Sequence, residues 1–134
     1  MSSYFKDISK IQYEGVDSNN PLSFKYYDED KVILGKKMKD HLRFATCYWH
    51  TFTWPGLDPF GGPTFERPWM QQGDPIEKAE EKLDEAFDFF DKITTPFFCF
   101  HDRDISPEGQ NYSETQKNFF HIIDLMEKKL SKSK

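Results

Sequence analysis

The feature that most constrains the fold is a run of four apolar residues, 97–100, with the sequence Phe-Phe-Cys-Phe. Pro96 precedes the run, and Pro107 and Gly109 close the polar segment that follows it. A short apolar run without alternation, bounded by turn signals, is typical of a strand buried on both faces, as in parallel sheets. We therefore expect a buried parallel strand here.

Ionisable side chains follow this strand directly. They are one imidazole and three carboxylates, from His101, Asp102, Asp104 and Glu108. Barrels and open sheets of the α/β class place their active sites at the C-terminal ends of parallel strands. We therefore expect the functional site at this strand end. Imidazole and carboxylates are also metal ligands, but their spacing matches no recognised metal-binding loop, so we predict no metal site from them.

The overall composition is that of one aromatic-rich domain. The chain has 134 residues, with 14 Phe, 6 Tyr and 3 Trp, and a net charge of −5. Because there is no basic stripe, we expect no nucleic-acid partner. No apolar run approaches the roughly 20 residues of a membrane helix, and the N-terminus lacks a signal-peptide core. The two cysteines, Cys47 and Cys99, show no metal-ligand spacing, which predicts buried free thiols in a reducing cytoplasm.

Residues 1–43 are expected to form an N-terminal arm that wraps the core. Three local patterns occur in it: helical spacing of Tyr4, Phe5, Ile8 and Ile11, alternation at Leu22, Phe24 and Tyr26, and a short basic helix over 36–42. A first strand is predicted over 44–49, ending at Trp49-His50-Thr51. The long loop 52–73 that follows carries Phe52, Trp54, Phe60, Phe65 and Trp69. Ligand, core or another subunit must cover so many aromatics.

Two amphipathic helices complete the chain. The first begins with Asp74 as N-cap, Pro75 at the first helical position and Glu77 closing a capping box. Its apolar stripe is Ile76, Ala79, Leu83, Ala86, Phe87, Phe90 and Ile93, and its polar face is Lys78, Glu81, Lys82, Glu85 and Asp88. The second helix is predicted to start at a capping box of Ser113 and Gln116. Two successive βα units imply parallel strands joined by a right-handed crossover.

Eight blocks in order along the chain resemble xylose isomerase, most closely its longer-armed bacterial and fungal class. They are Tyr13-Glu14-Gly15, Asn20-Pro21-Leu22, Gly35-Lys36-Lys37-Met38, His41-Leu42-Arg43-Phe44-Ala45, Tyr48-Trp49-His50-Thr51-Phe52, Asp58-Pro59-Phe60-Gly61, Arg67-Pro68-Trp69 and the segment 100–109. The resemblance covers essentially all of residues 4–130. It implies an α/β fold in which 1–43 is the arm and 44–134 are the first two βα units of a (β/α)8 TIM barrel.

The resemblance also implies an activity and partners. The family converts aldose to ketose, D-xylose to D-xylulose, with two divalent metal ions, Mg²⁺ or alternatively Mn²⁺ or Co²⁺. The metal ligands of the family would lie beyond this chain, which alone is expected to be inactive. Expected partners are the sugar and either a homo-oligomer, a homotetramer in the family, or a complementary C-terminal barrel fragment. The expected location is the cytoplasm.

Four residues acquire roles by the resemblance. His101 would contact the sugar ring oxygen and assist ring opening, and Asp104 would hold the His101 ring in one tautomer. Trp49 would form an apolar wall against the sugar, and Phe60 would reach into the active site of a neighbouring subunit. Plainer interpretations exist. His101 could be a structural histidine hydrogen-bonded beside loop acids such as Asp104, Trp49 could be a core residue, and Phe60 could be a buried loop anchor.

Two other functions fit the same sequence. The chain could be a non-catalytic truncated paralogue that associates with other barrel chains through its interface elements. It could also be a small, aromatic-rich sugar-binding module. Isomerase activity in a reconstituted complex would distinguish a xylose isomerase segment from a non-catalytic paralogue. Sugar affinity without a partner would favour the sugar-binding module.

Overall fold

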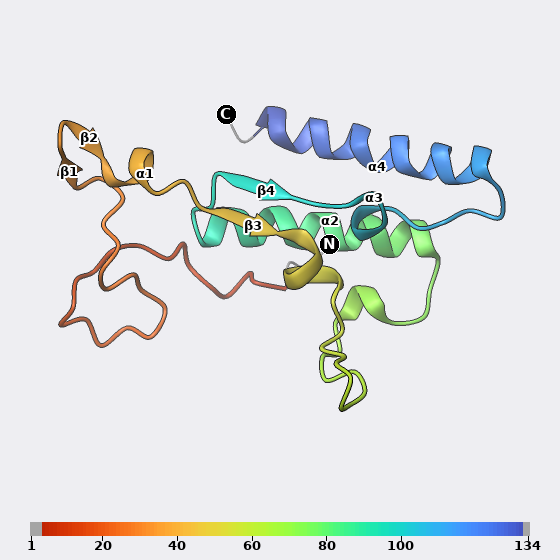
Figure 1. Ribbon diagram of the computed structural model, residues 1–134, viewed down its shortest axis with the longest axis horizontal. Coiled ribbons are helices and arrows are strands. Elements are labelled where there is room, and N and C mark those ends of the chain that lie inside the picture. Colours follow the sequence, from red (N-terminus) through yellow and green to blue (C-terminus); the bar gives the residue numbers. More distant parts are fainter. Residues whose placement is uncertain (1–3, 133–134) are drawn as a thin grey trace.

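The computed structural model describes residues 4–132. The outermost residues of the predicted arm (1–43) and of the predicted βα segment (44–134) therefore lie outside the described part. In chain order the elements are β1 (Val32–Ile33), β2 (Lys36–Lys37), α1 (Met38–His41), β3 (Ala45–Cys47), the π-helical turn η1 (Trp49–Thr53), the 3-10 turn η2 (Pro68–Met70), α2 (Pro75–Lys92), β4 (Phe97–Cys99), α3 (Asp102–Ile105) and α4 (Tyr112–Lys132). Figure 1 shows α2 crossing behind β3 and β4, with α4 alongside.

Strands β3 and β4 form a two-stranded parallel sheet, as the sequence predicts. Ala45 pairs with Phe97, Thr46 with Phe98 and Cys47 with Cys99. The connection between them runs through η1, η2 and the 18-residue helix α2. The strands are shorter than predicted, because the chain leaves β3 at Tyr48 and turns into η1.

Only one face of this sheet is covered. Thr46 is buried, and the Phe98 ring stacks on Phe90 of α2 with centroids 4.9 Å apart. On the opposite face, Phe97 is 40% exposed and Cys99 is exposed. The prediction of a strand buried on both faces is therefore wrong for β4, and so is the prediction that Cys99 is buried. Helices α2 and α4 lie on the same side, and on the other side the Arg43 guanidinium lies 4.5 Å from the centroid of the Phe97 ring.

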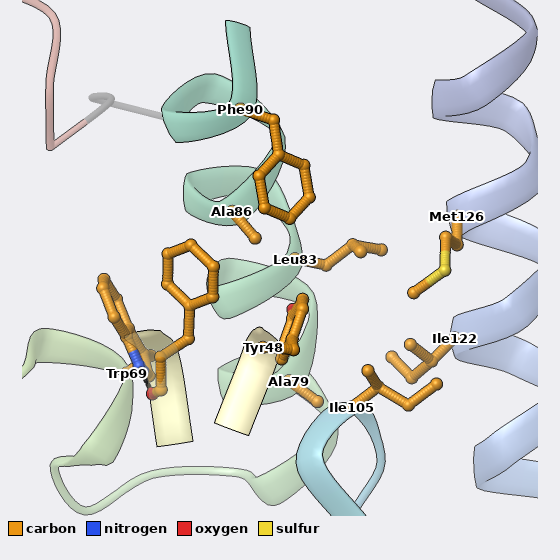
Figure 2. Packing of buried hydrophobic residues seen from close by; sticks show 10 residues of the cluster. Tyr48, Trp69, Ala79, Leu83, Ala86, Phe90, Ile105, Ile122 and Met126 are labelled. Atoms are coloured by element: carbon orange, nitrogen blue, oxygen red, sulfur yellow. Dashed lines mark hydrogen bonds between the residues drawn. The ribbon is translucent and has the colours of Figure 1, made fainter. Parts of the chain in front are cut away.

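The hydrophobic core lies between this sheet, α2, α3 and α4. Figure 2 shows its members pointing toward one another from α2, α3, α4, η2 and the segment that follows β3. They are Tyr48, Phe52, Trp69, Ala79, Leu83, Ala86, Phe90, Ile105, Ile122 and Met126. Three of them, Tyr48, Phe52 and Ile105, come from the segments that directly follow β3 and β4. The core therefore holds the ends of both strands in place. Within residues 4–132, no helix combines the length and apolarity needed to cross a membrane.

The helix starts follow local capping chemistry. Asp74 Oδ1 accepts hydrogen bonds from the backbone N–H groups of Ile76 and Glu77, each at 3.0 Å, which confirms Asp74 as the N-cap of α2. The predicted capping box at Ser113 is wrong. Asn111 Oδ1 accepts from the Glu114 N–H at 3.0 Å, and the Glu114 carboxylate accepts from the Gln110 N–H at 2.7 Å. Helix α4 consequently begins before Ser113.

The arm contains less regular structure than its patterns predict. Residues 4–7 form a turn, so the helical spacing through Ile11 does not correspond to a helix. Tyr4 and Phe5 instead contact Trp69 and Phe89, at centroid distances of 6.2 and 5.6 Å. The alternation near Phe24 yields only an isolated bridge to Tyr13.

The predicted basic helix over 36–42 is divided between β2 and the four-residue α1. The arm nevertheless docks on α2, because Ile11 donates its N–H to the Lys92 carbonyl at 2.7 Å.

Candidate functional site

His101 and Trp49 leave the parallel sheet at the same end. The last paired residues are Cys47 and Cys99, and each of the two candidates lies two positions further along the chain, just beyond the end of its strand. Because paired parallel strands run in the same direction, both residues follow the C-terminal edge of the sheet. This edge is where parallel α/β proteins assemble their sites.

His101 and Asp104 contact each other twice. The Asp104 Oδ2 atom accepts the backbone N–H of His101 at 2.8 Å and lies 3.0 Å from the His101 Nδ1 atom. His101 is the N-cap of α3 and Asp104 is its third residue, so the short helix itself sets their distance. The His101 side chain is 77% exposed, whereas that of Asp104 is 4% exposed. A buried carboxylate therefore holds an imidazole that faces outward.

This geometry selects one tautomer of His101. An ionised carboxylate can only accept hydrogen bonds, so the Nδ1 atom opposite Asp104 Oδ2 must carry the proton. In the neutral imidazole, Nε2 is then unprotonated and able to accept a proton from solvent or from a bound hydroxyl group. The pair can therefore act as a general base with its orienting carboxylate in place.

Two groups whose pKa values are influenced by Asp104, Tyr48 and Lys82, were not predicted as part of the site. Tyr48 is fully buried, and its hydroxyl has no hydrogen-bond partner in the described structure. Burial, and secondarily the charge of Asp104, raise the pKa of Tyr48 far above its usual value. The Lys82 Nζ atom lies 5.9 Å from the centroid of the Tyr48 ring. Burial lowers the pKa of Lys82 to about 8, and the attraction of Asp104 only partly opposes this effect.

The prediction that Lys82 and Glu85 belong to a solvated helix face is wrong. Lys82 is only partly exposed, and Glu85 is buried, where its Oε2 atom accepts the Tyr4 backbone N–H at 2.7 Å. Tyr4 of the arm contacts Glu85, and the Tyr48 ring lies next to Lys82, so this side of α2 is covered. The only sequence signal was the position of both residues next to the apolar stripe, where long side chains can bury their stems.

Trp49 begins η1 and is 38% exposed. Its ring contacts His50 at a centroid distance of 4.5 Å and Trp54 at 6.1 Å. Turn η1 is tied to α3, because the Thr53 hydroxyl donates to the Asp104 carbonyl at 3.2 Å. Trp49 therefore sits in a half-exposed aromatic group on an element that is linked to the His101–Asp104 pair.

The loop after η1 is held at its base and projects at its tip. Arg67 donates to the carbonyls of Trp54 and Thr51 at 2.6 and 2.9 Å, and the Trp69 indole donates to the Phe52 carbonyl at 2.8 Å. Figure 1 shows the segment between η1 and η2 extending away from the body of the molecule. Two of the loop aromatics, Phe52 and Trp69, lie at this base and belong to the hydrophobic core.

Phe60 stands at the projecting tip and is 97% exposed. Its backbone N–H donates to Asp58 Oδ1 at 2.7 Å, and Asp58 and Gly61 form a two-way backbone bridge at 3.4 Å. The turn is thus well defined although the ring contacts almost nothing. Within this chain Phe60 does not join His101 and Asp104, and the interpretation as a buried loop anchor is wrong.

The four potential metal ligands near β4 do not converge. Glu108 pairs with Arg103, Asp102 Oδ1 accepts the Arg103 N–H at 2.8 Å, and Asp104 pairs with His101. Across residues 4–132, no cluster of three or more His, Cys, Asp or Glu side chains could hold a metal ion. The residues present therefore do not fit a metal centre of their own.

Comparison with known proteins confirms the resemblance noted in the sequence. The chain is 55% identical over 129 residues to a xylose isomerase of Photobacterium profundum, and 52% identical over 129 residues to one of Pseudoalteromonas atlantica. It is 56% identical over 126 residues to a xylose isomerase of Rhizobium etli. These matches cover 94–96% of the chain, and no family model matches it.

The chain spans under a third of the length of these relatives, 28–29% in each case. The matches are consistent with an N-terminal segment of a xylose isomerase. Relatives of this kind imply a TIM barrel, and the described chain is a small α/β unit with short sheets.

Proposed function

We propose that this chain acts as the N-terminal part of a xylose isomerase, an enzyme that converts D-xylose to D-xylulose. In this proposal residues 1–43 are the arm and 44–134 are the first two βα units of a (β/α)8 barrel. The identity of 52–56% to three such enzymes supports it. The parallel pairing of β3 and β4, with one face left open, also supports it, because a barrel strand is covered on both faces.

The observation that carries the proposal is the contact between His101 Nδ1 and Asp104 Oδ2 at 3.0 Å. Ring opening of a pyranose requires a proton to leave the anomeric hydroxyl and a proton to reach the ring oxygen. The free Nε2 atom of His101 takes the first proton while the bond between the anomeric carbon and the ring oxygen breaks. It then delivers a proton to that oxygen. Asp104 stabilises the intermediate imidazolium and prevents the ring from turning.

Trp49 and Phe60 would shape the pocket. Trp49, half-exposed at the end of β3, would offer an apolar surface to the sugar. Phe60, on its rigid turn, would enter the active site of a neighbouring subunit of an oligomer such as a tetramer. The 97% exposure of this ring supports a role outside its own chain, because a large exposed aromatic ring is a typical interface anchor.

Metal chemistry is assigned to residues outside this chain. The enzyme would use two divalent ions, Mg²⁺ or alternatively Mn²⁺ or Co²⁺. Since the candidate ligands of residues 4–132 do not converge, the complementary part of the barrel would supply the metal site. Ring opening by His101 and Asp104 does not require a metal ligand from the complementary part of the barrel.

Reconstitution tests the proposal. The purified chain is mixed with a polypeptide that comprises the Photobacterium profundum relative without its aligned segment, and xylulose is measured with xylose and Mg²⁺. We expect turnover from the mixture and none from either part. His101→Asn should abolish turnover, whereas the matched control His121→Asn should not, because His121 lies on the surface of α4. A stable complex without turnover would contradict the proposal.

A second function is favoured by the uncovered aromatics alone. Phe60 and Phe97, at 97% and 40% exposure, would suit a chain that associates with other barrels without catalysis. A stable but inactive complex is the outcome expected for such a chain. If Phe60→Ser weakens the complex while His101→Asn changes nothing, this alternative is supported.

A further inference from the structure

The start of the arm is held on α2 by a buried carboxylate. The Glu85 Oε2 atom accepts the Tyr4 backbone N–H at 2.7 Å, and Glu85 is only 7% exposed. Four residues further along the same face of α2, the Phe89 ring lies 5.6 Å from the Phe5 ring, measured between centroids. Tyr4 and Phe5 are therefore fixed to α2 although they belong to no helix or strand.

The Tyr4 ring also packs on the residue that fastens η1. Its centroid lies 6.2 Å from that of Trp69, with the two rings nearly perpendicular. Trp69 is buried, and its indole donates to the Phe52 carbonyl of η1 at 2.8 Å. The position of the arm start is therefore linked to that of η1 through one tryptophan.

Turn η1 extends this link to the ends of both parallel strands. It begins with Trp49, which follows β3, and it is closed by the Trp54 N–H, which donates to the Trp49 carbonyl at 2.7 Å. Its Thr53 hydroxyl donates to the Asp104 carbonyl at 3.2 Å. A continuous series of contacts consequently leads from Glu85 on α2 to the candidate ring-opening pair.

Glu85 differs from the acidic residues around it on α2. Three of these neighbours form ion pairs with lysines, whereas Glu85 has no cationic partner among residues 4–132. The pairs are Glu81 with Lys78, Asp84 with Lys129, and Asp88 with Lys92. The charge of Glu85 is therefore buried against a backbone N–H alone, which is unfavourable.

This environment makes the contact sensitive to pH. Burial raises the pKa of Glu85 above its ordinary value of 4.5, and the Tyr4 hydrogen bond opposes this effect only in part. The charges of Asp88, Asp84 and Glu81 raise it further. The contact is therefore strongest where Glu85 is protonated, below pH 4.5, and weakens as the pH rises through the raised pKa.

We propose that Glu85 is a positioning residue for the candidate site, because it sets how firmly the arm holds Trp69, and hence η1, at the strand ends. The inference rests on the proposed function, since η1 serves catalysis only if Trp49 and Asp104 belong to a sugar site. A neutral acceptor at position 85 holds the arm more firmly than a charged one.

Hydrogen exchange of the purified chain, followed by NMR, tests the proposal without sugar or activity. Glu85→Ala should lower the protection factor of the Tyr4 amide by about tenfold or more. It should also lower the protection of the Trp69 indole N–H and of the Trp54 amide. Glu85→Gln should keep all three protected, because the Gln side chain still offers an oxygen to Tyr4. The matched control Glu80→Ala, on the same helix but in contact with α4, should change none of them.

The pH dependence separates this role from that of a plain packing contact. In the wild-type chain, the protection factor of the Tyr4 amide should fall severalfold as the pH is raised from 4.5, after correction for the intrinsic exchange rate. In Glu85→Gln it should stay constant over the same range, since Gln has no charge to bury. The Trp69 indole N–H should follow Tyr4 in both chains.

Three results would overturn the proposal. They are equal protection of the Tyr4 amide in wild type and Glu85→Ala, a loss at Tyr4 that leaves Trp69 and Trp54 unchanged, and wild-type protection that does not vary with pH. Circular dichroism of each variant establishes that it is folded. The pH series on the wild-type chain remains decisive even if a variant fails to fold. Failure of the reconstituted enzyme to turn over xylose would contradict the proposed function and would leave these exchange results unchanged.

Discussion

Residues 4–132 contain two histidine–carboxylate pairs that differ in almost every physical respect. His101 uses Nδ1 to contact Asp104, which lies three residues away and has a side chain only 4% exposed. His121 on α4 uses Nε2 to contact Glu80 on α2 at 2.5 Å, and both side chains are well exposed, at 46% and 36%. The first pair is set by one short helix, and the second by the packing of two long ones.

The difference shows why one pair suits catalysis and the other does not. In the first pair the carboxylate is buried and the imidazole is exposed, so Nε2 remains free for a substrate. In the second pair Nε2 is already occupied, and water screens the contact on both sides. Identical chemical groups therefore serve a site or a surface according to which nitrogen is bound and which partner is buried.

The largest effect is expected from Asp104→Asn. Loss of the charge removes support for the imidazolium and allows the wrong tautomer, so activity of the reconstituted enzyme should fall on the order of 10³-fold or more. The free energy of unfolding of the chain should also fall, by about 1.5–3 kcal/mol, because hydrogen bonds to a buried charged group are lost. Turnover and urea denaturation measure the two effects. Unchanged turnover of the Asp104→Asn variant would contradict the claim that the His101–Asp104 pair suits catalysis and the His121–Glu80 pair does not.

Lys82→Met tests the buried surroundings of the first pair through pH. The folded-state pKa of Lys82 is about 8, below the ordinary value of 10.5, so the unfolded chain binds more protons between these values. Wild-type stability relative to the Met variant should therefore rise from pH 8 to 10.5 and be lowest below pH 8, by about 1–3 kcal/mol. Urea denaturation across this range is the measurement. A difference that is independent of pH would place Lys82 in solvent.

Thr53→Val probes the link between the two strand ends. The variant removes the hydroxyl that donates to the Asp104 carbonyl at 3.2 Å and keeps a similar shape. We expect a loss of about 1 kcal/mol in the free energy of unfolding. In the reconstituted enzyme kcat should fall more than xylose affinity, since the change displaces α3. A loss of affinity alone would argue that η1 acts on the sugar through Trp49 only.

The smallest effect is expected from Glu80→Gln. The carboxylate is exposed, and exposed ion pairs contribute about 0.2–1 kcal/mol or less. Activity should be unchanged, and any stability loss should shrink with added salt. A loss as large as that of Asp104→Asn would mean that the α2–α4 contact, and not the strand end, is the sensitive feature.

The sequence predicted the elements that depend on local chemistry. The parallel strands, the N-cap at Asp74 and the position of His101 beyond a strand all follow from short-range patterns. Asn111 was overlooked as the N-cap of α4, although Asn is as strong a cap as Ser, because Ser113 offered a similar pattern two residues later. The resemblance to xylose isomerase rested on ordered blocks and needed no tertiary information.

Features that depend on contacts distant in sequence were not predictable. Tyr4 and Phe5 have helical spacing but pack on Trp69 and Phe89 instead. Cys99 has a buried sequence context, yet its face of the sheet is open. Lys82 lies next to the Tyr48 ring only because the packing of α2 against the segment after β3 places it there.

Nitrogen-15 NMR of the four imidazole rings, assigned by single His→Asn variants, tests the central claim most directly. At a pH where the rings are neutral, His101 should carry its proton on Nδ1 and His121 on Nε2. Asp104→Asn should release the preference of His101 and leave His121 unchanged. A His101 ring protonated on Nε2 in the folded chain would contradict the claim that Asp104 keeps this nitrogen free for a sugar.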